Sequence, residues 1–158
     1  MRLKPIAALL FGLACSPLPA ADLATTLEQY QGKVVYLDFW ASWCSPCKKS
    51  FPWMQEMQSR YGNQGLQVVA VSVDESEADM KKFLATQAVD FAVVHDPKGT
   101  LAQSYALVGM PSSFLLDRNG TVVARHVGFN AASAAEYEAG IAAQLGRAVP
   151  NPLADSSK

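Results

Sequence analysis

Cys44 and Cys47 are separated by two residues in the segment Trp43-Cys44-Ser45-Pro46-Cys47, and this pair is the feature of the chain best suited to chemistry. A disulfide between them would close a very small loop, so it would remove little entropy from the unfolded chain and stabilise the fold only slightly. The pair therefore indicates redox chemistry or metal binding rather than a structural cross-link.

Cys44 lies between a predicted strand at 33–40 and a predicted helix at 45–61. Its sulfur should therefore face the unpaired N–H groups and the positive dipole end of that helix, which stabilise a thiolate. Cys47, one turn later, would be within reach to close a disulfide or to release a bound partner. Pro46 fits the first helical turn, where its missing N–H costs nothing.

Asp38 is a carboxylic acid inside the otherwise apolar and aromatic stretch 34–40. A continuous apolar run of this kind is typical of a strand that is covered on both faces. Burial would raise the pKa of Asp38, so that it could act as a base near neutral pH. The alternative is that Asp38 reaches water at an edge of the sheet.

A metal site is the main alternative for the cysteine pair. A zinc ion takes four ligands, and the two histidines of the chain, His95 and His126, lie in or beside predicted strands without ligand spacing. We interpret both as surface or rim residues and expect no metal and no other cofactor. A metal-binding chaperone that uses Cys44 and Cys47, and an adaptor that uses only the fold, stay open.

The composition is that of one globular domain, since 50% of the 158 residues are hydrophobic and 17% are charged. The 13 basic and 14 acidic side chains leave a net charge of -1. Without a basic surplus to bind phosphates, nucleic acid is excluded as a partner. We expect a monomer.

The hydrophobic pattern predicts an α/β domain at 22–148 in which helices and strands alternate. The predicted helices span 22–31, 45–61, 77–88, 100–108 and 134–145. The predicted strands span 33–40, 66–73, 91–94, 112–116 and 121–127. Asn119-Gly120 is typical of a hairpin turn, so the last two strands should be antiparallel.

The two ends of the chain do not fit the domain. Basic residues precede a short apolar run within 1–21, and a bilayer-spanning helix would need ~20 apolar residues, so we predict a secretion signal. Either the signal is removed to leave a soluble extracytoplasmic protein, or Cys15 becomes a lipidated first residue; both routes withdraw Cys15 from disulfide chemistry. The segment 149–158, with two prolines and two serines, is predicted to be a disordered tail.

The segment Asp38–Cys47, Asp-Phe-Trp-Ala-Ser-Trp-Cys-Ser-Pro-Cys, resembles the active site of thioredoxins, and residues 22–146 resemble the exported thioredoxin-like proteins of the TlpA/ResA type. Val108-Gly109-Met110-Pro111 corresponds to the loop that carries a cis-proline facing the disulfide in that family. The resemblance implies a thioredoxin fold with a central mixed β-sheet flanked by helices and an extra helix and strand inserted between 77 and 105.

The same resemblance assigns roles to single residues. It makes Cys44 the attacking cysteine, Cys47 the resolving cysteine of the redox-active disulfide, and Asp38 the buried acid that exchanges a proton with Cys47. Trp40 and Trp43 resemble the paired tryptophans beneath and beside the disulfide.

The resemblance also implies a substrate-binding surface that Trp43, Met110 and Pro111 share. A cis bond at Pro111 would leave the backbone of Met110 free for strand-like pairing with a substrate.

Two positions depart from the family pattern. Thioredoxins place a lysine against the buried acid, and the matching position here is Ala70, so the pKa of Asp38 should be higher than with a cation beside it. Relatives of the ResA type carry a functional glutamate in the loop after the second strand, where Asp74, Glu75 and Glu77 are available. We expect a solvated acidic loop there.

The dipeptide Ser45-Pro46 lacks the histidine that strongly oxidising relatives place between their cysteines. We therefore predict a protein-disulfide reductase with a reduction potential nearer ~-270 mV than ~-120 mV. The family implies an exported substrate such as an apocytochrome c and a membrane electron donor that re-reduces the pair. A metal-binding chaperone is the alternative function.

Overall fold

The computed structural model describes residues 23–147. The predicted secretion signal at 1–21, with Cys15, and the predicted tail at 149–158 lie outside the described residues. The described strands are β1 (Val34–Trp40), β2 (Leu66–Ser72), β3 (Ala92–His95), β4 (Ser112–Leu116) and β5 (Val122–Val127). The helices are α1 (Leu23–Glu28), α2 (Ser45–Tyr61), α3 (Glu77–Leu84), α4 (Thr100–Ser104) and α5 (Ala131–Leu145), with a 3₁₀ turn, η1, at Gly62–Gln64.

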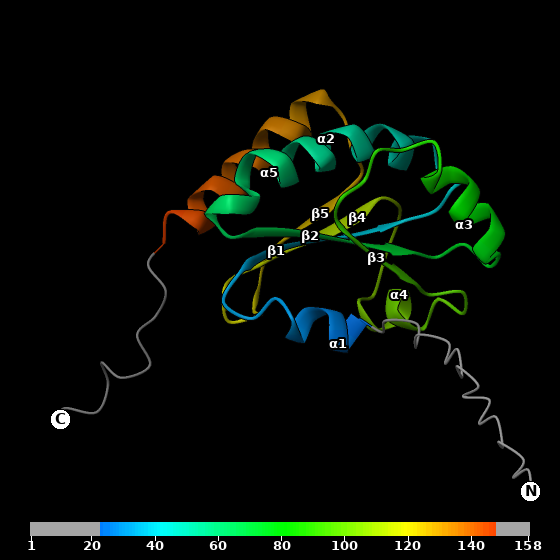
Figure 1. Cartoon of the computed structure of the whole chain (residues 1–158), viewed down its shortest axis with the longest axis horizontal. Helices are drawn as coiled ribbons and strands as arrows, with labels where there is room; N and C mark the ends of the chain where they lie inside the picture. Colours follow the sequence, from blue (N-terminus) through cyan, green and yellow to red (C-terminus); the bar gives the residue numbers. More distant parts are fainter. Residues whose placement is uncertain (1–22, 148–158) are drawn as a thin grey trace, which may run out of the picture.

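The strands form one sheet in the order β3-β2-β1-β4-β5. β1 runs parallel to β2 and antiparallel to β4, while β3 is parallel to β2 and β5 is antiparallel to β4. Helices α2 and α5 lie over one face of this sheet, and α1 and α4 lie on the other (Figure 1). The predicted α/β fold with a mixed central sheet and a terminal hairpin is confirmed.

The sheet separates two hydrophobic clusters, because alternate residues of a strand point to opposite faces. Tyr36 and Trp40 of β1 pack with side chains of α2 and α5, whereas Val35, Leu37 and Phe39 pack on the face of α1 and α4. Every residue of β1 and β2 is buried, as the continuous apolar runs predict for strands covered on both faces.

Four helix bounds differ from the sequence prediction. The helix predicted at 22–31 ends at Glu28, where turns follow in which Tyr30 N–H donates to the carbonyl of Leu27. The helix predicted at 77–88 ends at Leu84, where tight turns follow in which Thr86 N–H donates to the carbonyl of Phe83. The helix predicted at 100–108 ends at Ser104, since Ala106 adopts a left-handed φ of 49° that an α-helix does not allow.

The last helix begins at Ala131 instead of Ala134. Asn130 caps it by accepting hydrogen bonds from the N–H groups of Ala132 and Ser133, and the Ser133 hydroxyl accepts one from the N–H of Asn130 in return. This reciprocal capping box adds three residues to the start of α5.

Candidate active site

Cys44 is the N-cap residue of α2 and forms a disulfide with Cys47. The sulfur of Cys44 accepts a hydrogen bond from the backbone N–H of Cys47 at 3.3 Å, so it occupies the position that a serine or aspartate oxygen takes at an ordinary helix start. Cys44 keeps 6% of its surface exposed and Cys47 is completely buried. Of the two cysteines, the one at the positive end of the helix is therefore the one that keeps some exposed surface.

Asp38 lies on β1, in the middle of the sheet, and is 1% exposed. One carboxyl oxygen, Oδ2, has no hydrogen-bond partner, and burial raises the pKa of the Asp38 carboxyl well above its ordinary value. The alternative that Asp38 reaches water at a sheet edge is contradicted. Tyr36, Trp40 and Ala70, which point to the same face, share a hydrophobic cluster with Cys47, so Asp38 lies on the face that α2 covers.

Tyr36 and Ser113 are buried polar residues next to this acid that sequence reasoning missed. Ser113 of β4 lies directly opposite Asp38, and the Tyr36 hydroxyl donates a hydrogen bond of 2.7 Å to the Ser113 hydroxyl. Burial, and secondly the charge of Asp38, raise the pKa of Tyr36. The signal for this cluster was the serine pair Ser112-Ser113 in an otherwise apolar strand.

The two tryptophans differ in their exposure. Trp40 is completely buried, with its ring centre 4.6 Å from that of Phe51 and 5.1 Å from that of Phe83. Trp43, the neighbour of Cys44, exposes 68% of its surface. A large apolar side chain that is mostly exposed beside a reactive group marks a surface on which another chain can dock.

Met110 and Pro111 are joined by a cis peptide bond, as the resemblance implies. Ser112, the next residue, pairs with Phe39 near the end of β1, so the loop lies at the same end of the sheet as Cys44. The Pro111 carbonyl accepts a hydrogen bond from Gly128 N–H at 2.8 Å, which ties the loop to the end of β5. Val108 in this loop is 79% exposed, so a second exposed apolar side chain, besides Trp43, lies at this end of the sheet.

The expectation of a solvated acidic loop after β2 is wrong for Asp74. This side chain is buried, and its carboxylate accepts hydrogen bonds from Ser42 and Ser72. Glu77 is exposed and pairs with Lys81 on the same helix at 2.9 Å. Local sequence gave no reason to separate Asp74 from its neighbours, because its partner Ser42 lies 32 residues earlier.

The histidines are half-buried, in keeping with a place at the rim. His95 Nε2 lies 2.7 Å from the carbonyl oxygen of Asp74, and the His126 ring stacks on Tyr137 with centres 3.8 Å apart. Burial lowers the pKa of His126. Within residues 23–147, no three His, Cys, Asp or Glu side chains are grouped to hold a metal ion.

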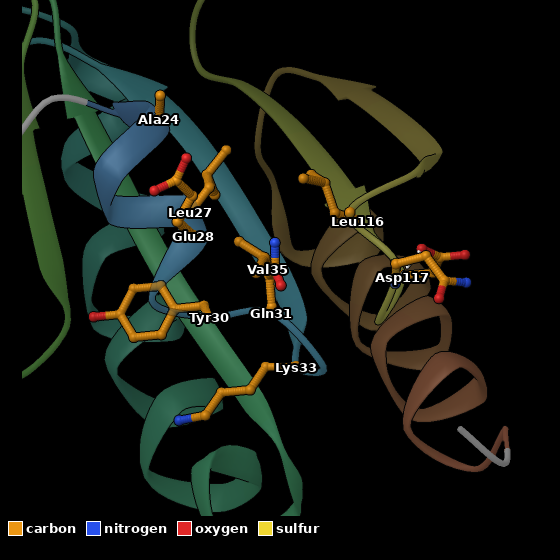
Figure 2. A pocket seen from close by; sticks show the side chains of 11 residues that line it. Ala24, Leu27, Glu28, Tyr30, Gln31, Lys33, Val35, Leu116 and Asp117 are labelled. Carbon is orange, nitrogen blue, oxygen red and sulfur yellow. Dashed lines mark hydrogen bonds between the residues drawn. The ribbon is translucent and has the colours of Figure 1, made fainter. Parts of the chain in front are cut away.

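A cavity of about 290 Å³ opens at the other end of the sheet (Figure 2). It lies between Leu27 of α1 and Tyr30 of the turn that follows, on one side, and Leu116 at the end of β4 and the next residue, Asp117, on the other. Val35 at the start of β1 lines it, whereas Cys44 follows the end of that strand. This cavity is therefore separate from the cysteine site.

Over residues 23–147, no helix has the length and apolar character that crossing a membrane requires.

Comparison with known proteins adds a family and several relatives. Residues 18–125 match the model of the AhpC/TSA family. The thiol-disulfide oxidoreductase ResA of Bacillus thuringiensis subsp. konkukian (strain 97-27) is 35% identical over 97 residues, which cover 61% of this chain and 56% of that protein. The chain thus spans little more than half the length of the curated relatives it matches.

Two solved structures are similar in three dimensions. A candidate thiol:disulfide interchange protein DsbE from Chlorobium tepidum is 52% identical with a TM-score of 0.75, covering 76% of this chain and 85% of that one. The thioredoxin domain of a thiol-disulfide oxidoreductase from Bacteroides vulgatus is 27% identical with a TM-score of 0.64, covering 73% and 84%. These likenesses confirm the thioredoxin fold and the resemblance to proteins of the ResA type.

Proposed function

This chain belongs to the AhpC/TSA family, and from that premise we propose that it is a thiol-disulfide oxidoreductase that reduces disulfides in other proteins. The observation that carries the proposal is the Cys44–Cys47 disulfide at the start of α2, on the face of the sheet that holds the buried acid Asp38. The names of the ResA and DsbE relatives support the same activity.

In the proposed reaction, the reduced pair gives two electrons to a substrate disulfide. The Cys44 thiolate attacks one substrate sulfur, and the other substrate sulfur leaves as a thiolate that takes a proton. The Cys47 thiol then passes its proton to Asp38 and attacks the Cys44 sulfur, which breaks the mixed disulfide. The substrate departs with two thiols, and the Cys44–Cys47 bond is restored.

Asp38 is suited to this step because its pKa is raised by burial, which brings the carboxyl closer to the pKa of the thiol it must deprotonate. Cys47 is completely buried, so bulk water has little access to its proton. We therefore assign Asp38 as the proton acceptor of the resolving step.

We assign substrate binding to Trp43, Met110 and Pro111. The exposure of Trp43 and Val108 supports this assignment, because both offer apolar surface at the end of the sheet where Cys44 lies. An extended substrate segment would pair with the Met110 backbone in the manner of an added strand, with its disulfide over Cys44.

The proposed setting is extracytoplasmic. The apolar segment within 1–21 supports export, either as a soluble periplasmic protein or as one held by a lipid on Cys15. In such a compartment a reductase needs a supply of electrons, so we propose a membrane electron donor that re-reduces Cys44–Cys47. An exported disulfide protein such as an apocytochrome c is the proposed substrate, and a monomer is the proposed form.

A thiol titration combined with insulin reduction tests this function. The purified protein should show no free thiol at Cys44 and Cys47 when oxidised and two after reduction, and it should accelerate insulin reduction by dithiothreitol. The Cys44→Ser protein should lose that acceleration. If the wild-type protein instead leaves insulin unchanged and copurifies with zinc or copper bound by the pair, the metal-binding alternative replaces the reductase.

A further inference from the structure

Asp74 is a buried carboxylate just beyond β2 that the proposed reaction does not use. It is 2% exposed, and none of the ion pairs among residues 23–147 includes it. Four hydrogen bonds converge on its two oxygens. Ser42 N–H donates to Oδ1 at 3.1 Å and to Oδ2 at 2.9 Å, the Ser42 hydroxyl donates to Oδ1 at 2.7 Å, and the Ser72 hydroxyl donates to Oδ2 at 2.8 Å.

Ser42 belongs to the turn that carries the reactive cysteine. The turn begins at Ala41, whose carbonyl accepts a hydrogen bond of 3.0 Å from Cys44 N–H. It joins the end of β1 to the start of α2. Because Asp74 holds both the N–H and the hydroxyl of Ser42, the turn is attached to the end of the neighbouring strand as well as to its own.

Ala41 at the start of this turn is completely buried, whereas Trp43 on its outer side is open to solvent. Trp43, between Ser42 and Cys44, is mostly exposed and so has few packing contacts of its own. The sulfur of Cys44 must nevertheless stay at the first turn of α2 to accept the Cys47 N–H at 3.3 Å. A shift of the turn would move the sulfur away from the N-terminus of α2. The helix dipole stabilises a thiolate only within about the first turn, so the thiolate would lose this stabilisation.

We propose that Asp74 is a positioning residue for Cys44, which fixes the Ala41–Cys44 turn through Ser42 and so keeps the attacking sulfur at the start of α2. This inference rests on the proposed function, in which Cys44 is the nucleophile. Asp74 touches neither the sulfur nor a substrate in this role and acts through Ser42 and the turn.

Position and charge predict opposite results when Asp74 becomes neutral. If Asp74 acted by its negative charge, Asp74→Asn would favour the Cys44 thiolate and lower the pH midpoint of its alkylation. If it acts by position, the same change should raise that midpoint. In Asp74→Asn, whichever oxygen the amide nitrogen replaces, a donor takes the place of one of the two acceptors of the Ser42 N–H, so the attachment of the turn is weakened.

The other charged groups around the turn stay the same in every variant. Lys48 of α2 and Asp79 and Lys82 of α3 line a cavity with Ser42, and Glu75 and Asp79 line one with Trp43 and Asp74. His95 of β3 lies 2.7 Å from the carbonyl oxygen of Asp74, and Asp38 lies under α2 on the sheet. A change in the alkylation profile can therefore be assigned to the substituted residue.

The test is the rate of iodoacetamide alkylation of Cys44 against pH in the reduced protein, with a matched control. The control residue is Asp96, a buried carboxylate directly after β3 that is 5% exposed. Like Asp74, it accepts a hydrogen bond from a backbone N–H, in this case that of Ala102 at 3.0 Å. Asp74→Asn should raise the midpoint by about one pH unit, which slows alkylation at neutral pH about tenfold. Asp96→Asn should leave the midpoint unchanged even where it lowers the melting temperature equally.

Ser42→Ala removes only the hydroxyl bond to Oδ1, so the protein should fold and show a smaller rise in the midpoint. If Asp74→Asn does not fold, the midpoint of Ser42→Ala alone decides whether Asp74 positions the turn. A midpoint that falls, or that stays unchanged in both Ser42→Ala and Asp74→Asn, would overturn the positioning role. Alkylation needs no protein substrate, so this result stands apart from the insulin assay that decides the proposed function.

Discussion

Asp38 on β1 lies directly opposite Ala70 on β2, so a methyl group occupies the place beside the buried carboxyl where thioredoxins have a lysine. Both residues are buried, and among residues 23–147 no cation offsets the loss of water around the acid. The raised pKa of Asp38 thus follows from burial without a compensating charge. Two predictions about Asp38 depend on this pairing.

The first prediction concerns stability. Between the ordinary pKa of an aspartate and the raised pKa of Asp38, the folded protein binds a proton that the unfolded chain has released. Stability should therefore fall as pH rises through that window, by up to about 1.4 kcal/mol per pH unit from this group. Asp38→Asn removes this pH-dependent contribution to the free energy of unfolding. The oxidised variant should therefore become more stable relative to the wild type as pH rises. Urea unfolding at several pH values measures this, and parallel curves for the two proteins would contradict it.

The second prediction concerns the rate of reduction. Asp38→Asn removes the proton acceptor of Cys47, so insulin reduction should slow most near neutral pH. At high pH the Cys47 thiol ionises by itself and the two proteins should converge. An Asp38→Asn profile that matches the wild type over the whole range would show that Asp38 has a structural role only.

The third prediction concerns the buried hydrogen bond between Tyr36 and Ser113. Tyr36→Phe and Ser113→Ala each leave one buried hydroxyl without its partner and should each lower the free energy of unfolding by roughly 1–3 kcal/mol. The double variant should lose less than the sum, because no unpaired hydroxyl of this pair remains. Urea unfolding of the four proteins measures the coupling.

A pair of substitutions on opposite faces of the sheet provides the control for this cycle. Ser104 donates its hydroxyl to the Leu101 carbonyl on α4, away from Tyr36. Tyr36→Phe and Ser104→Ala should therefore be additive within about 0.5 kcal/mol. Additivity of the Tyr36 and Ser113 changes as well would mean that their hydrogen bond contributes nothing to stability.

Local sequence was sufficient for the elements that are determined by hydrophobic pattern and turn residues. The continuous apolar runs gave β1 and β2, and Asn119-Gly120 gave the β4–β5 hairpin, with Gly120 at a left-handed φ of 79°. The start of α5 could also have been predicted, since Asn130 and Ser133 have the spacing of a capping box.

Hydrogen bonds between residues that are far apart in the sequence could not be predicted from local patterns. The Ser42–Asp74 bond spans 32 residues and the Tyr36–Ser113 bond spans 77, and no periodicity within one segment encodes either. The left-handed Ala106 that ends α4 likewise has no local signal, because alanine is a good helix former. The sequence therefore predicted the cysteine pair and the buried acid, and it missed the hydrogen bonds that join distant residues around them.

The last prediction tests the division of labour between the two sulfurs. Cys44 keeps 6% of its surface exposed, whereas Cys47 is completely buried. In the Cys47→Ser protein, Cys44 should still attack a substrate disulfide, but the mixed disulfide has no resolving thiol. Covalent adducts should therefore accumulate in cells and vanish on addition of a reductant, as judged by non-reducing gels and mass spectrometry.

The Cys44→Ser protein is the matched control, since it also keeps one thiol of the pair. Its remaining sulfur, that of Cys47, is buried within α2 and does not lie at the helix start, so it should trap few partners. Equal trapping by the two variants would mean that burial does not decide which sulfur attacks. Adducts restricted to Cys47→Ser would make Cys44 the nucleophile, because the two proteins differ only in which sulfur is left.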